Sequence, residues 1–359
     1  MLFNYRYVPH SIETFQAWMD HLVKNVWCRN DGTAYSIELL INDLKDVVVE
    51  IGNDDSIQKD HLDGPIKAID AIMQTDLSAA QRIQMAEWYD SNNDIEALYT
   101  NDTQKEPVTY DELKTINADL EKELKSFFKS LFASVIHLKA VQSRIGHIDD
   151  HYKEFVKENN EGKCPYCGIN DIKGEHHTKR EAYDHFLPKG TYPFNSVNFR
   201  NLAPMCHECN STYKLQKDPT LHIDPLNRGA SGTRRKAFYS FSKTEPKISI
   251  ELTLNTSNSS ELSPEVIDLR ATSPGCDEEV EGWQEVYGIE ERYKAKCCGE
   301  NDGKAWLQRV IEERINYDLT EGQMLAAELK AAANKPWSDS NFLKKPFLES
   351  CVDAGILAE

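Results

Sequence analysis

The chain has 359 residues, of which 40% are hydrophobic and 28% are charged, and its formal net charge is −18. This length and composition are typical of a globular protein with two or three domains. No apolar run approaches the ~20 residues of a membrane span, and the first six residues lack a signal-peptide pattern. We therefore expect a cytoplasmic protein without a membrane segment.

Residues 1–160 are expected to form a helical domain that serves regulation, partner binding or oligomerisation. Helices are predicted over 11–27, 35–50, 65–74 and 78–98, followed by a loop at 101–107. Thr109 and Glu112 then form a capping-box pattern. The apolar residues after it are spaced mostly by three and four, which predicts a long amphipathic helix that continues in pieces towards Glu158.

The middle segment, 161–225, has a different composition. It is rich in Gly, Pro, Asn, Cys and His, and helical periodicity is weak before Cys206. Such a segment is too poor in apolar residues for a large core, so it needs a metal to hold it together. A helix is expected to begin at the second cysteine pair and to run through Asn210 to Lys214.

The C-terminal region, 226–359, is expected to hold short strands and then helices. Residues 247–254 alternate between polar and apolar and predict a strand, with which 237–241 could pair. Helices are predicted over 277–296, 302–316 and 321–333. The fold class is therefore α+β and mostly helical, with a small zinc-stabilised domain embedded between helical regions.

Two short cysteine pairs are the clearest chemical signal. Two residues separate Cys164 from Cys167 and two separate Cys206 from Cys209, with 38 residues between the pairs. In a reducing compartment such pairs favour metal ligation over disulfides, and four thiolates make a closed, structural zinc site. His207 lies within the second pair and is expected to be solvated. The dipeptide of Cys297 and Cys298 is interpreted as two ordinary thiols.

Asp184 and His185 are the reactive candidates between these pairs. A neutral imidazole with an ordinary pKa near 6.5 can take a proton from water at neutral pH. A divalent cation held by oxygen ligands can neutralise a phosphate, and Asp184 and Asn210 offer such oxygens. Because neighbouring side chains of a strand point to opposite sides, one can face the metal and the other the water.

Charge is distributed unevenly along the chain. Residues 1–160 hold 16 Lys and Arg against 28 Asp and Glu, a net charge of −12, and residues 241–359 hold 13 against 23, a net charge of −10. Residues 161–240 hold 12 against 8, a net charge of +4. The basic stretch coincides with the cysteine segment, where a polyanion such as DNA would have to bind.

The motif over 164–214 resembles the HNH endonuclease family, which consists of ββα-metal nucleases, here with a four-cysteine zinc ribbon. The cysteine pairs, the Asp184-His185 dipeptide, Asn201-Leu202 and the Asn210 to Lys214 segment occur in the order of that family. The form of the motif around Phe186, Pro188 and Lys189 resembles HNH proteins of bacterial anti-phage defence systems, including Septu-type and retron-associated nucleases. In those systems an ATPase or another sensor often controls the nuclease.

The resemblance implies a role for each matching residue. His185 would be the general base, Asp184 and Asn210 would bind a catalytic Mg²⁺ or Mn²⁺, and Asn201 would brace the loop and orient His185. The four cysteines would hold structural Zn²⁺. Lys214, or alternatively Lys189, would contact phosphate.

Further basic residues leave two interpretations open. Arg234 and Arg235 could follow a DNA backbone or form a solvated basic turn. His176 and His177 are expected to lie in a surface loop. The leading hypothesis is a metal-dependent DNA endonuclease, for which a homodimer is one expected assembly. The alternatives are a non-catalytic zinc-ribbon module that binds nucleic acid and an interaction protein whose zinc only stabilises the fold.

Overall fold

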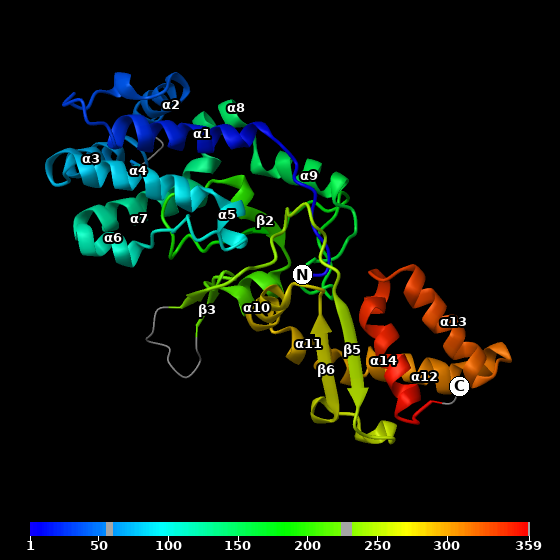
Figure 1. The fold of residues 1–359 in the computed structure, drawn as a ribbon. Coiled ribbons are helices and arrows are strands. Elements are labelled where there is room, and N and C mark those ends of the chain that lie inside the picture. Colours follow the sequence, from blue (N-terminus) through cyan, green and yellow to red (C-terminus); the bar gives the residue numbers. More distant parts are fainter. Residues whose placement is uncertain (55–59, 224–231, 358–359) are drawn as a thin grey trace.

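The computed structural model describes residues 1–54, 60–223 and 232–357. The described chain is mostly helical and contains three two-stranded sheets, which agrees with the predicted α+β class. Figure 1 shows the first helices gathered at one end of the molecule and α12 to α14 at the other, with the middle segment between them. The predicted boundary at 225 and 226 lies outside the described residues.

The helices of the N-terminal half follow the predicted ranges closely, with interruptions. The α-helices of this half are α1 (Thr14–His21), α2 (Asn42–Gly52), α3 (Asp63–Thr75), α4 (Ala79–Asn93), α5 (Ile95–Tyr99), α6 (Tyr110–Ile116), α7 (Ala118–Ala133), α8 (Lys139–Ile145) and α9 (Ile148–Glu158). The expected capping box at Thr109 is present. The long helix predicted after it is interrupted at Asn117, whose φ of −155° is extended and whose side chain accepts from Leu120 N to start α7.

The C-terminal helices are also more broken than predicted. They are α10 (Asp277–Tyr287), α11 (Ile289–Cys298), α12 (Gly303–Ile311), α13 (Glu321–Asn334) and α14 (Asn341–Asp353). Gly288, with φ of +60°, separates α10 from α11 inside the helix predicted over 277–296. Helix α14 was not predicted, and it contains Pro346.

All three sheets are antiparallel pairs. β1 (Ala182–His185) pairs with β2 (Leu202–Met205), and β3 (Leu221–His222) pairs with β4 (Thr233–Arg234). The predicted strand at 247–254 is present as β5 (Ser249–Leu254), but its partner is β6 (Ile267–Thr272). The expected pairing with 237–241 was wrong, because Ala237 N bonds to Tyr99 O and Tyr239 packs against Phe186 instead.

The middle segment contributes to both of the large apolar clusters and to a small third one, which holds Phe186, Leu187 and Tyr192. Tyr183, Phe194, Phe199 and Leu202 belong to the cluster of the N-terminal helices. The four cysteines of the pairs belong to the cluster that contains β5, β6, α10, α11 and α14 side chains, together with Met1 and Leu2. The middle segment thus joins the two helical ends. Among the described residues, no helix is long and apolar enough to cross a membrane.

Candidate metal centre and candidate active site

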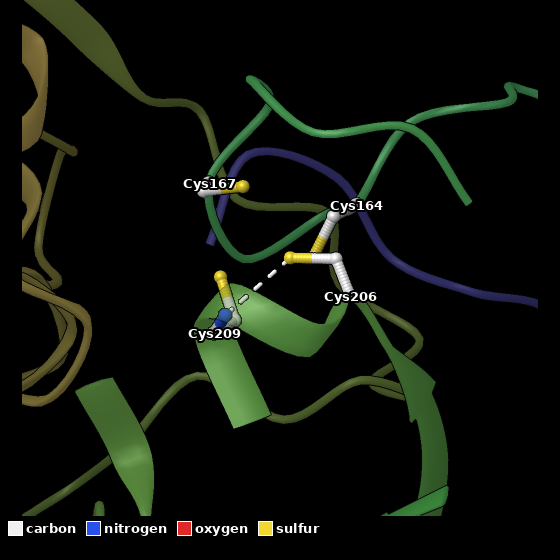
Figure 2. A group of neighbouring side chains, drawn as sticks. All are labelled: Cys164, Cys167, Cys206 and Cys209. Atoms are coloured by element: carbon white, nitrogen blue, oxygen red, sulfur yellow. Dashed lines mark hydrogen bonds between the residues drawn. The ribbon is translucent and has the colours of Figure 1, made fainter. Parts of the chain in front are cut away.

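The four cysteines of the two pairs converge on one point. Their Sγ atoms all lie within 4.8 Å of one another, and all four residues are buried. Figure 2 shows Cys164 and Cys167 on one turn, Cys206 just before η6 (Glu208–Lys214), a π-helical segment, and Cys209 in its first turn. All nine cysteines lie within the described ranges, and none of them forms a disulfide there.

A tight turn presents the first pair. Cys167 N and Gly168 N both donate to Cys164 O, at 3.3 and 2.7 Å. Gly168 has φ of +66°, and a Cβ there would lie 2.4 Å from Leu2 Cδ1. The turn therefore requires glycine, both for its left-handed backbone and for the close approach of Leu2.

The donor set fits zinc. Four buried, mutually close sulfurs match the closed tetrahedral set of a structural Zn²⁺, in which Zn–S bonds of about 2.3 Å place the sulfurs about 3.8 Å apart. His207 is exposed, as expected, and is no member of the group. The cysteine pairs could therefore hold a structural zinc ion.

Three distant segments hold the backbone of the first cysteine turn. Leu2 N donates to Pro165 O at 2.8 Å, Trp283 Nε1 to Tyr166 O at 2.6 Å, and Tyr293 Oη to Cys167 O at 2.9 Å. Every carbonyl of this turn after Cys164 is thus bonded to another part of the chain. The metal centre is consequently continuous with α10, α11 and the first residues of the chain, which no local pattern predicts.

Asp184 and His185 end strand β1, opposite Ala203 and Leu202 of β2. Their side chains point to opposite sides, as a strand requires. Asp184 faces η6, where its carboxylate meets Lys214, whereas His185 faces the 186–201 connection and the N-terminal helices. A β1–β2 hairpin followed by η6 therefore carries the predicted motif.

His185 is buried, with 6% of its surface exposed. Its Nε2 lies 2.9 Å from Ser196 O, and the ring contacts Phe132 of α7 edge to face at a centroid distance of 4.8 Å. Because a carbonyl only accepts, Nε2 must carry the proton, and Nδ1 holds the lone pair of the neutral ring. Burial is the main reason that the pKa of His185 is lowered to about 3, with a further contribution from the Lys189 ammonium.

Asp184 forms a buried ion pair with Lys214. The Lys214 ammonium lies 3.0 Å from Asp184 Oδ2 and donates to His185 O at 2.7 Å, and Lys214 has no exposed surface. Burial raises the pKa of Asp184 above its usual value, while Lys214 opposes that shift. Lys214 was expected at a phosphate, but here it is buried against the carboxylate, because η6 turns its ammonium inward.

Asn201 ties the two ends of the connection between β1 and β2. Leu187 N donates to Asn201 Oδ1 at 2.8 Å, and Asn201 Nδ2 donates to Leu187 O and Asn195 O at 3.1 and 3.3 Å. All three bonds are buried. The residue therefore has the geometry of a loop brace beside His185, whose carbonyl partner Ser196 follows Asn195 directly.

The other candidate residues lie at or beyond the edge of this group. Asn210 is half-buried, and its side chain makes no hydrogen bond to the described residues. Lys189 places its ammonium 4.8 Å from the centre of the Phe132 ring. Arg234 is half-buried and donates to Leu98 O, and Arg235 is buried and pairs with Glu285 at 2.7 Å. Arg235 is therefore not part of a solvated turn, and a DNA contact by these two arginines stays a prediction.

The remaining expectations concern exposed and buried groups nearby. His176 and His177 are exposed and lie in a loop, as predicted. Cys297 is buried in the same cluster as Cys351, and it is not a member of the metal-ligand group found in the described chain. Phe132 and Ser196 were missed, because neither a phenylalanine on a helix nor a serine carbonyl leaves a signal in sequence.

Comparison with known proteins gives one partial relationship of note. The chain is 38% identical to the Septu protein PtuB of Bacillus thuringiensis over 77 residues, which cover 20% of this chain and 29% of that protein. The matched part therefore spans less than a third of that relative. No family model matches the chain, and no solved structure matches it. The similarity agrees with the resemblance to Septu-type proteins that the motif carries.

Proposed function

We propose that this chain is a metal-dependent HNH endonuclease that hydrolyses DNA phosphodiester bonds in an anti-phage defence system. The observation that carries the proposal is the β1–β2–η6 unit with His185 held in one tautomer beside the Asp184–Lys214 pair. A zinc-stabilised module that only binds nucleic acid would need the cysteines but not this arrangement.

His185 would act as the general base. The Ser196 carbonyl fixes the proton on Nε2, so Nδ1 is the atom that takes a proton from water. The lowered pKa keeps the ring neutral throughout the physiological range. Asn201 would position this base indirectly, by holding the loop that carries Ser196.

Asp184 and Asn210 would hold the catalytic Mg²⁺ or Mn²⁺. Such an ion is commonly bound by one or two protein side chains together with water and substrate phosphate. The Asp184 carboxylate and the Asn210 amide oxygen would make a ligand set of that size. When bound, the ion neutralises charge on the scissile phosphate and on the leaving oxygen. Lys214 already supplies positive charge to Asp184, and Lys189, whose charge also acts on Asp184, would contact the phosphate.

A defence role is supported by the similarity to a Septu protein. The net charges of −12 over 1–160 and −10 over 241–359 are poorly suited to DNA and better suited to docking a partner. We expect that partner to be an ATPase or another sensor protein of the same system. A homodimer would allow two single-strand cuts to be made together.

Plasmid cleavage with Mg²⁺ or Mn²⁺ tests the proposal, with the partner co-purified where one is encoded beside the chain. We expect nicking or cutting that His185→Ala abolishes. His207→Ala is the matched control, because His207 is an exposed histidine of the same segment. Cleavage that persists in His185→Ala would refute the role of His185. Binding of DNA without cleavage under every condition would favour the zinc-ribbon binding module instead.

A further inference from the structure

Arg292 of α11 contacts the cysteine group directly. Its Nη1 lies 3.2 Å from Cys209 Sγ and also 3.2 Å from Tyr287 O, to which it donates. The guanidinium carbon lies 4.7 Å from the centre of the Tyr213 ring, and only 8% of the residue is exposed. Arg292 is thus a buried cation fixed on three sides, and one of its fixed contacts is a metal-ligand sulfur.

The chain is shaped to bring this arginine to the sulfur. Gly288 takes a left-handed conformation between α10 and α11, and a Cβ at this position would lie 2.3 Å from the Tyr213 ring. The glycine therefore lets η6 and α11 approach closely. Arg292 N donates to Gly288 O at 3.1 Å, which places the arginine one helical turn after that contact.

Charge gives this contact its significance. Four thiolates around one Zn²⁺ carry a net charge of −2, and burial makes such a charge costly unless it is hydrogen-bonded or paired. Within the described chain, the other donors to these sulfurs are neutral: Asn170 Nδ2 lies 3.6 Å from Cys206 Sγ, and Cys209 N lies 3.5 Å from the same atom. Arg292 is the charged donor of the set.

We propose that Arg292 is a positioning residue of the metal centre, which offsets the charge of the zinc tetrathiolate through Cys209 and makes zinc retention depend on α11. Sequence spacing places Arg292 83 residues beyond Cys209, outside the motif. This role of Arg292 concerns zinc retention and not DNA cleavage. It can therefore fail while the proposed nuclease activity stands, and it can hold if the chain cleaves no DNA.

Zinc release to a chromogenic chelator measures the effect on the purified full chain. Outer-sphere partners typically contribute 10–100-fold to metal affinity, so Arg292→Gln should release zinc at least about tenfold faster. Arg292→Lys, which keeps the charge, should recover part of the loss. Tyr293→Phe is the matched control from the same helix, because the hydroxyl that it removes donates to the Cys167 carbonyl and not to a sulfur.

The cobalt-substituted protein separates a sulfur contact from general loosening. Removing a hydrogen bond from a thiolate raises the energy of its lone pairs, so the sulfur-to-cobalt charge-transfer band of Arg292→Gln should move to longer wavelength. Tyr293→Phe should leave the band in place. Unchanged release and an unchanged band in Arg292→Gln would overturn the proposal. So would equal acceleration of zinc release by Arg292→Gln and Tyr293→Phe without any shift of the band. If Arg292→Gln does not fold with zinc, Arg292→Lys takes its place, and its zinc release rate and cobalt charge-transfer band decide.

Discussion

The buried pair of Asp184 and Lys214 gives the sharpest test of the site geometry. Lys214→Met removes the ammonium and keeps the length of the side chain, which leaves the Asp184 carboxylate buried without its cation. At the observed 3.0 Å separation, an effective dielectric constant near 20 gives an attraction of about 5.5 kcal/mol. Breaking one partner of a buried pair usually costs about 3–5 kcal/mol. We therefore expect the free energy of unfolding at pH 7 to fall by about that amount.

Urea unfolding in the presence of zinc measures the loss, and a second substitution identifies its cause. Asp184→Asn in the Lys214→Met background removes the stranded charge and should recover much of the stability. The loss in Lys214→Met should also shrink at lower pH. Burial raises the pKa of Asp184 in the folded protein, so the folded state binds the proton more readily than the unfolded state there.

A surface pair provides the control. Lys67 and Asp63 lie 2.6 Å apart with 55% and 36% of their side chains exposed, so Lys67→Met should cost under about 1 kcal/mol. A loss of that small size in Lys214→Met would show that water reaches the pair, and the burial argument for the site would be refuted.

Further substitutions test the zinc ligands, the two buried histidines and the cover of His185. Cys209→Ser should lose bound zinc and lower the melting temperature, whereas Cys298→Ser, at a half-buried cysteine outside the group, should keep both, as zinc analysis and calorimetry would show. The pKa values of His185 and His151 are lowered to about 3 and about 4, so the free energy of unfolding should decline as the pH falls below about 6.5. His185→Gln should remove part of this decline, and urea unfolding at several pH values measures it. Phe132→Ala should open one face of His185 and move the pKa of that imidazole back towards about 6.5, while Phe132→Leu should leave the pKa unchanged. NMR titration of the imidazole measures both values. An unchanged pKa in Phe132→Ala would contradict the proposed cover.

Local patterns predicted the parts of the structure that depend on short spacings. The cysteine pairs, the capping boxes at Thr109 and Thr320 and the exposed loop at His176 all follow from neighbours within a few residues, and the structure has them. The general α+β class followed from helical periodicity before and after the middle segment, 161–225, together with its absence within most of that segment.

Contacts between distant segments could not be predicted in this way. Ser196 and Phe132 meet His185 only because the β1–β2 connection folds against α7. Lys214 was expected to contact a phosphate, and its burial depends instead on the pair that it forms with Asp184 of β1. The partner of β5 was misassigned because the competing segment is drawn into a cluster with Phe186. The catalytic roles of Asp184, His185, Asn201 and Asn210 stay predictions.

Zinc content and DNA cleavage, measured in one preparation of His185→Gln, test directly whether His185 is the base of a zinc-stabilised nuclease. We predict one zinc ion per chain, unchanged folding and no metal-dependent cleavage beside an active wild type, because the cysteines hold the fold and His185 supplies the base. Cleavage at the wild-type rate by the zinc-loaded variant would contradict this prediction.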